Sequence, residues 1–334
     1  MFIKQAYKGR TSFWRYIVGS IIIIIASVIG QLPFGIAVFM KEGMNAGTMD
    51  EAELMGALEP NLGLFLLLIS FLIAGVGLWF VVKFLHDLTL KDITTTRSKV
   101  DWNRFGFGFL IVAILTISLT VSDYVANPED YVVNFKPIPF LILCVIAIIL
   151  VPIQTSVEEL VFRGYLMQGF GILAKNRGFA LILTSLIFGG LHFFNPEVGK
   201  LGNLVMISYI GTGFLLGIMT LMDEGMELAL GFHAGNNLIA ALLVTTDWTV
   251  FQTHSILKDI SEPSLGLEVL LPVLVVYPLI LIVMARKYGW SDWKHKLFGK
   301  VDEPVPVIRE QSGLADKLAG EIPENEVDLK QNED

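Results

Sequence analysis

The stretch SVEELVFRGYL, residues 156–166, places three charged side chains inside a strongly apolar run. An unpaired charge in hydrocarbon costs on the order of several kcal/mol, so such residues persist where they pair or serve a function. Glu159 and Arg163 are four positions apart with the acid first, which favours an ion pair on one helical face. Glu158 lies about 100° away around the helix, so it is the carboxylate without an evident local partner.

The composition of the whole chain is that of a membrane protein. Of its 334 residues 54% are hydrophobic and 17% are charged, whereas about a quarter are charged in a soluble domain. The apolar residues gather in eight runs near the ~20 residues that a helix needs to cross a bilayer. We therefore expect an all-α polytopic membrane protein with about eight transmembrane helices. The expected spans are 13–40, 62–85, 105–121, 138–173, 179–194, 204–222, 228–244 and 265–285.

The placement of basic residues predicts the orientation of these spans. Lysine and arginine gather before the first run, in the second and fourth loops and after the last run. Cytoplasmic loops carry such an excess, so both termini are expected in the cytoplasm. The loop 223–227 is an exception, because it is acidic on the basic side. No short apolar segment with a small-residue cleavage site opens the chain, so we expect no removable signal peptide.

The charges divide the chain into two expected parts. Residues 1–290 should form the membrane domain, and residues 291–334 a polar acidic cytoplasmic tail. From Asp302 onward ten acidic residues stand against three basic ones, a composition typical of a disordered segment. No basic surface with interleaved aromatic residues is evident, so we expect the lipid bilayer and no nucleic acid as a partner.

Two further polar clusters lie in the apolar runs, FGGLH at 188–192 and HAGNN at 233–237. If the fourth and fifth spans form an antiparallel hairpin that turns at Lys175, Glu158 and His192 each lie 17 residues from the turn. The two side chains are then expected to face each other. His233 and Asn237 are four positions apart, so an imidazole and an amide share one face of the seventh span.

These residue types can perform hydrolysis. A carboxylate in an apolar site can take a proton from water, and a histidine can orient that water. A second histidine and an amide can donate hydrogen bonds to a tetrahedral oxyanion. The same set could instead bind a divalent metal such as zinc through Glu158, His192 and His233, since glutamate and histidine are good zinc ligands. No HExxH is present, so such a site would have to be assembled across helices.

At these residues the chain resembles the CPBP family of intramembrane proteases, also called the CAAX amino-terminal protease or Abi family. The family pattern is EExxxR, then FxxxH, then HxxxN on successive helices. Here the motifs read EELVFR at 158–163, FGGLH at 188–192 and HAGNN at 233–237. The resemblance covers about residues 137–245. Some members carry an asparagine four residues after the second-motif histidine, where this chain has Pro196 and an asparagine one position earlier.

The resemblance implies an eight-helix core with a membrane-embedded catalytic cavity that is open to the cytoplasm. It also implies a role for each motif residue. Glu158 and His192 would activate water, and His233 and Asn237 would stabilise the oxyanion. The supporting residues would be Glu159, Arg163 and Phe188. The resemblance leaves open whether a catalytic metal is needed.

The leading function is therefore an intramembrane endopeptidase in the cytoplasmic membrane of a bacterium, acting on membrane-associated peptides or proteins. Prenylated CAAX-type substrates are one option among these. An alternative is a non-proteolytic membrane partner or bacteriocin-immunity protein that retains the fold. A secondary transporter with Glu158 as its proton site is disfavoured, because the chain shows no internal repeat.

Overall fold

The structure, a computed structural model, describes residues 1–263 and 267–304. In the described part, seven helical segments are long and apolar enough to cross a membrane. They are Phe13–Thr48, Pro60–Leu85, Trp102–Ala126, Pro137–Leu173, Arg177–Phe194, Asn203–Asp223 and Val269–Tyr288. The seventh predicted run, 228–244, is also helical, but it forms the 17-residue helix α11, Glu227–Leu243, which is not among these seven segments. The prediction of an all-α polytopic membrane protein is confirmed.

Helix α11 differs from the other spans in its surroundings. At ~1.5 Å per residue it is about 25 Å long, less than the ~30 Å of a typical hydrocarbon core. It packs against α5 (Trp102–Ala126), α6 (Pro137–Glu159) and α10 (Met206–Asp223). A helix with protein on these sides can carry polar residues, because they need not face lipid.

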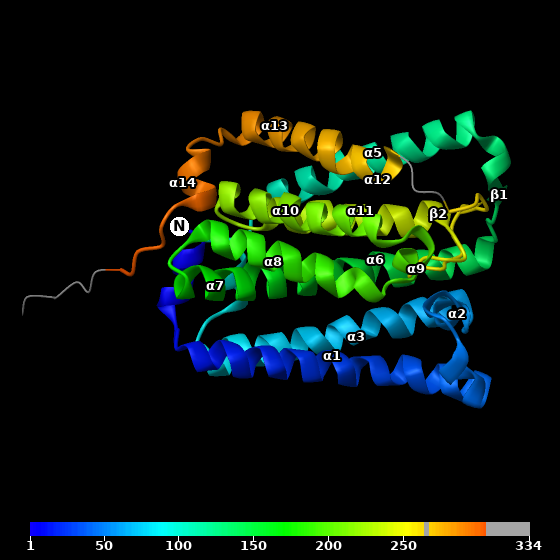
Figure 1. Ribbon diagram of the computed structural model, residues 1–334, viewed down its shortest axis with the longest axis horizontal. Coiled ribbons are helices and arrows are strands. Elements are labelled where there is room, and N and C mark those ends of the chain that lie inside the picture. Colours follow the sequence, from blue (N-terminus) through cyan, green and yellow to red (C-terminus); the bar gives the residue numbers. More distant parts are fainter. Residues whose placement is uncertain (264–266, 305–334) are drawn as a thin grey trace, which may run out of the picture. The chain divides into compact units, whose positions relative to one another are not determined.

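The remaining elements complete this arrangement (Figure 1). In chain order the other helices are η1 (Ile3–Lys8), α1 (Phe13–Glu42), η2 (Gly43–Thr48), α2 (Glu51–Gly56), α3 (Pro60–Phe80), η3 (Val81–Leu85), α4 (Leu90–Thr94), η4 (Pro128–Asp130), η5 (Leu160–Leu166), α7 (Met167–Leu173), α8 (Arg177–Leu191), η6 (His192–Phe194), α9 (Pro196–Leu201), η7 (Asn203–Val205), α12 (Leu267–Leu271), η8 (Pro272–Val276), α13 (Tyr277–Tyr288) and α14 (Trp293–Phe298). Helices α1 and α3 form a hairpin that reaches the rest of the bundle mainly where α3 packs on α6. Helix α6 is therefore central, with α3 and α11 among its neighbours.

A small sheet lies at the end of the bundle where α2 also lies (Figure 1). Its strands are β1 (Tyr131–Val133), β2 (Val244–Thr245) and β3 (Leu257–Asp259), in the order β1-β3-β2. Strand β3 pairs antiparallel with β1 and parallel with β2. The sheet thus connects the loop after α5 with the chain that leaves α11.

Both described ends of the chain lie at the opposite end of the bundle (Figure 1). Segment η1 packs on α7, and α14 packs on α8 and α10. This arrangement is the one that an even number of crossings produces. The compact membrane unit extends from Met1 to Asp302, beyond the predicted boundary at residue 290, because α14 docks on the bundle. The rest of the predicted tail, from residue 305, lies outside the described residues.

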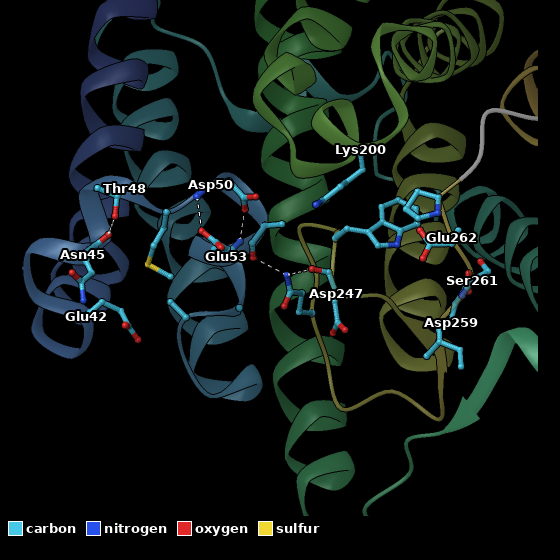
Figure 2. A pocket seen from close by; sticks show the side chains of 18 of the residues that line it. Glu42, Asn45, Thr48, Asp50, Glu53, Lys200, Asp247, Asp259, Ser261 and Glu262 are labelled. Carbon is cyan, nitrogen blue, oxygen red and sulfur yellow. Dashed lines mark hydrogen bonds between the residues drawn. The ribbon is translucent and has the colours of Figure 1, made fainter.

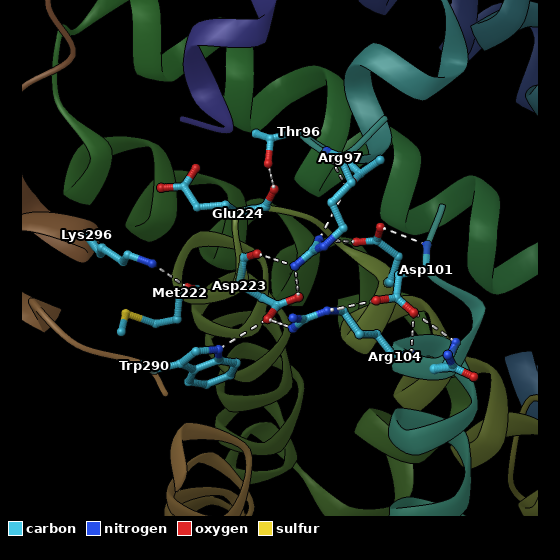
Figure 3. Close-up of polar contacts among 12 residues, drawn as sticks. Thr96, Arg97, Asp101, Arg104, Met222, Asp223, Glu224, Trp290 and Lys296 are labelled. Carbon is cyan, nitrogen blue, oxygen red and sulfur yellow. Dashed lines mark hydrogen bonds and ion pairs between the residues drawn. The ribbon is translucent and has the colours of Figure 1, made fainter. Parts of the chain in front are cut away.

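The acidic loop 223–227 is explained by a polar cluster at this same end (Figure 3). Arg97 donates to Asp223 Oδ2 at 2.8 Å and to Glu227 Oε2 at 2.9 Å. Arg104 also pairs with Asp223, whose Oδ1 accepts a bond from Trp290 Nε1 at 3.2 Å. The Asp223 and Glu227 side chains are almost fully buried. Arg97, from the loop between α4 and α5, and Arg104, on α5, compensate these two negative charges. The carboxylates of the acidic loop can therefore be buried.

Candidate active site

The first motif lies where a helix changes its winding. Helix α6 ends at Glu159 and continues into the π-helical segment η5, which carries Arg163. Pro152 inside α6 has no backbone N–H to donate, and Thr155 Oγ1 donates to the carbonyls of residues 151 and 152 at 3.1 and 3.3 Å. π-Helical turns widen a helix by one residue and occur frequently at functional sites.

The predicted Glu159–Arg163 ion pair is confirmed. Arg163 Nη1 donates to Glu159 Oε1 at 2.7 Å, and both side chains are completely buried. Arg163 Nη2 also donates to the carbonyl of Gly213 on α10 at 3.1 Å. The guanidinium carbon lies 4.3 Å from the centre of the Phe188 ring. The pair therefore joins η5 to α8 and α10, and it is more than a local contact within one helix.

His233 on α11 lies between the two glutamates. Its Nδ1 is 2.9 Å from Glu159 Oε1, and its Nε2 is 3.6 Å from Glu158 Oε2. Because a carboxylate accepts, Nδ1 carries the hydrogen in this contact. Glu159 thus determines which nitrogen of the ring is directed toward Glu158, as a carboxylate partner commonly does for a functional histidine.

Glu158 has a local partner that the sequence reasoning missed. Gln154, one helical turn earlier on α6, donates from Nε2 to Glu158 Oε1 at 2.7 Å. Asn237 Nδ2 in turn donates to Gln154 Oε1 at 3.4 Å, so the third motif joins the same network. The spacing of four residues between Gln154 and Glu158 in an apolar run was the signal that could have revealed this contact.

The predicted facing of His192 and Glu158 across the hairpin stays a prediction. His192 Nδ1 donates to the carbonyl of Phe188 at 2.7 Å. The Glu158 charge is near enough to act on His192 electrostatically, although no direct hydrogen bond or ion pair joins the two side chains within the described part of the chain. The direct partners of Glu158 there are Gln154 and His233.

Phe188 packs against the charged groups of the site. Its ring centre is 4.8 Å from that of His192 and 6.1 Å from that of His233. With the Arg163 contact, this ring touches the second-motif histidine, the third-motif histidine and the first-motif cation. The structure therefore brings all seven predicted residues into one connected region.

The donor groups do not fit the zinc site that the sequence left open. In the described part of the chain, no three histidine, cysteine, aspartate or glutamate side chains group closely enough to hold a metal ion. Glu158, His192 and His233 thus do not form a ready ligand set, and no step below is routed through a metal.

A large cavity of about 1040 Å³ lies elsewhere (Figure 2). It is an open, polar hollow at the end of the bundle that carries α2 and the sheet. Its lining includes Glu42, Asp50, Lys200, Asp247 and Glu262. It contains none of the seven motif residues, and Asp50 caps α2 by accepting from the backbone of residue 53 at 2.8 Å. This hollow is therefore distinct from the motif-bearing site.

Comparison with known proteins agrees with the motif geometry. The model of the Type II CAAX prenyl endopeptidase Rce1-like family matches residues 137–239. An uncharacterized protein of Bacillus subtilis (strain 168), YyaK, is 34% identical over 248 residues, which are 73% of this chain and 82% of that protein. The chain belongs to the Rce1-like family. No solved structure matches it.

The Rce1-like match begins with α6 and ends within α11. It therefore contains the three motif helices and α10, which receives the Arg163 bond. The family is a family of CAAX-type proteases, and the chain carries several helices able to span a membrane. Helices α1, α3 and α5 lie outside the matched residues, although α3 and α5 pack directly on the motif helices.

Proposed function

We propose that this chain is an intramembrane endopeptidase that hydrolyses a peptide bond of a membrane-associated peptide or protein. The observation that carries the proposal is the position of His233, which contacts Glu159 through Nδ1 and faces Glu158 through Nε2. Glu158 is partly open, with 15% of its side chain exposed, whereas Glu159 is fully buried. Only Glu158 can therefore meet water without displacing a structural partner.

In the proposed reaction, the Glu158 carboxylate accepts a proton from water as the oxygen attacks the carbonyl carbon of the substrate. His192 orients that water through Nε2, because its Nδ1 donates to the carbonyl of Phe188. The tetrahedral intermediate then collapses, the C–N bond breaks, and the proton passes from Glu158 to the leaving amine. Glu158 returns to its carboxylate form.

The oxyanion is assigned to Asn237 Nδ2 and His233 Nε2. Because His233 Nδ1 donates to Glu159, His233 donates to the oxyanion in its imidazolium form, with hydrogen on both ring nitrogens. His233 and Asn237 lie one helical turn apart on α11 and both contact residues of α6. Asn237 Nδ2 is engaged with Gln154 only through a long 3.4 Å contact, so it can turn to a stronger acceptor. Hydrogen-bond donors that are in place before the reaction make the largest single contribution to the rate enhancement of many acyl-transfer enzymes.

The substrate class follows from the surroundings of the site. Arg163, Glu159 and His233 lie among helices that carry long apolar surfaces, so the substrate has to reach the site within or beside a bilayer. We propose the bacterial cytoplasmic membrane, with both termini in the cytoplasm. A prenylated peptide with a CAAX-type end is the first substrate to test, as the family description suggests.

The test uses the purified chain in liposomes with two substrates, a farnesylated CAAX-type peptide and a library of unmodified membrane peptides. New termini are read by mass spectrometry. We expect cleavage by the wild type, none by Glu158→Gln, and normal cleavage by Glu129→Gln, an exposed acid in the loop after α5. Absence of new termini with both substrates, or unchanged cleavage by Glu158→Gln, would refute the proposal and favour a non-proteolytic partner or immunity protein.

A further inference from the structure

The backbone alone holds His192 weakly. Helix α8 ends at Leu191, and His192 opens the three-residue 3₁₀ turn η6. Such short turns have poorer hydrogen-bond geometry than an α-helix. A histidine that must hold one ring nitrogen in a reactive position therefore needs support from other elements.

That support comes from two neighbouring aromatic rings. Phe188 is one of them, with ring centres 4.8 Å apart and ring planes tilted by 50°. Tyr209, from the first turn of α10, is stacked on His192 with ring centres 4.4 Å apart and ring planes 25° apart. With Nδ1 bonded to the Phe188 carbonyl, the stack leaves Nε2 as the ring nitrogen available for chemistry.

Tyr209 is itself held by the segment between α8 and α10. Its hydroxyl accepts a hydrogen bond from Asn195 Nδ2 at 3.3 Å. The carboxyl group of Glu197 lies near enough to Tyr209 to interact with it, and it accepts a bond from the backbone N–H of Val250 at 3.1 Å. Burial raises the pKa of Glu197 above its ordinary value. The tyrosine ring is thus anchored at its far end by residues that lie outside the three motifs.

We infer that Tyr209 is a positioning residue for His192. Its ring holds the imidazole in the orientation and tautomer that direct Nε2 to the reaction, and Asn195 holds its hydroxyl. The inference rests on the proposed role of His192 in orienting water. In this inference Asn195 acts on His192 only indirectly, through its hydrogen bond to the Tyr209 hydroxyl.

The test compares Tyr209→Leu, which removes the stack and the hydroxyl, with Tyr209→Phe, which keeps the stack. The first readout is the ¹⁵N spectrum of the histidine rings of labelled protein in nanodiscs. The chain has five histidines, so the His192 signals are assigned by their loss in His192→Gln. We expect the Nδ1-protonated tautomer of His192 in the wild type and in Tyr209→Phe, and a mixture of tautomers in Tyr209→Leu.

The second readout is turnover of whichever peptide the wild type cleaves. We expect kcat to fall about 100-fold in Tyr209→Leu, the scale of a misplacement near 1 Å, with KM changed much less. Tyr209→Phe should retain most of the wild-type kcat. If Tyr209→Leu does not fold, Tyr209→Met, which also removes the stack, serves instead, with the same change of the His192 signals expected.

The two readouts separate the possible failures. Unchanged His192 signals in a folded Tyr209→Leu variant would overturn the inference, whether or not the wild type cleaves a peptide. Equal disturbance of His192 by Tyr209→Phe and Tyr209→Leu would also overturn it, because the stack would then not be the cause. If the wild type cleaves nothing, the proposed function fails, while the histidine spectra still decide whether Tyr209 positions the ring.

Discussion

The contact between α5 and α11 gives the sharpest prediction, because the two helices meet backbone to backbone. A Cβ added at Gly231 would lie 1.9 Å from the carbonyl oxygen of Phe105, and one at Gly235 would lie 2.8 Å from that of Phe109. Gly108 on α5 makes the reciprocal approach to α11. His233 lies between the two α11 glycines, so the separation of these helices determines where its imidazole is placed.

The magnitude follows from these distances. Ordinary van der Waals contact begins at 3.4 Å, and the added Cβ of Gly231→Ala would lie 1.9 Å from the Phe105 carbonyl oxygen. The helices would therefore have to move apart by up to about 1.5 Å, the difference between these two distances. Overpacking of this kind typically costs about 1–3 kcal/mol. A displacement near 1 Å at a catalytic group costs about 100-fold in rate. We therefore expect a lower Tm and a kcat reduced by about two orders of magnitude.

The matched control is Gly106→Ala on α5, where an added Cβ would meet no atom within 4 Å. It makes the same chemical change and should leave Tm unchanged or slightly higher, because alanine favours helix by up to ~1 kcal/mol over glycine. Thermal unfolding in detergent and peptide turnover are measured for both variants. If Gly231→Ala retains the stability and turnover of Gly106→Ala, the close helix contact does not position His233 and the reasoning is refuted.

Three further predictions test the charged groups. Glu158→Gln should abolish turnover with little loss of Tm. Arg163→Ala should lower the free energy of unfolding by about 3–5 kcal/mol, because Glu159 stays buried without its guanidinium. Equal losses of Tm in the two variants would contradict this division. Chelators should leave turnover unchanged, since the described residues form no ready metal-ligand group; inhibition that stoichiometric zinc reverses would show the opposite. Burial raises the pKa of Glu197, so the folded state holds this proton more tightly than the unfolded state does. Its contribution to stability is complete below the ordinary glutamate pKa and is lost as the pH rises through the raised value. The Tm of the wild type should fall across that window relative to the Tm of Glu197→Gln, and parallel profiles of Tm against pH would count against this assignment.

The sequence could predict the helices because each span is a long apolar run bounded by polar residues. The first and fourth predicted spans, 13–40 and 138–173, correspond to Phe13–Thr48 and Pro137–Leu173. The Glu159–Arg163 pair could be predicted for a similar reason, since it depends only on local helical spacing. These features follow from contacts within one helix.

The contacts of Glu158 and His192 could not be predicted in the same way. Counting 17 residues to either side of Lys175 assumes two regular helices with equal rise per residue. The first helix contains the π-helical segment η5, and the second ends at Leu191, before His192. Tyr209 was missed because its role depends on the packing of side chains from separate helices, which a single sequence does not reveal. Gln154 was missed although its spacing of four residues from Glu158 on one helix is a local signal.

The buried ion pair and the proposed chemistry of Glu158 are linked through Glu159. Glu159 Oε1 is 2.7 Å from Arg163 Nη1 and 2.9 Å from His233 Nδ1, so the same oxygen serves the ion pair and the imidazole. Loss of the guanidinium would strengthen the hydrogen bond from His233 Nδ1 to Glu159, and this would alter how His233 Nε2 interacts with Glu158. The influence of Arg163 on Glu158 therefore passes through α11, although both residues lie on the continuous α6–η5 helix.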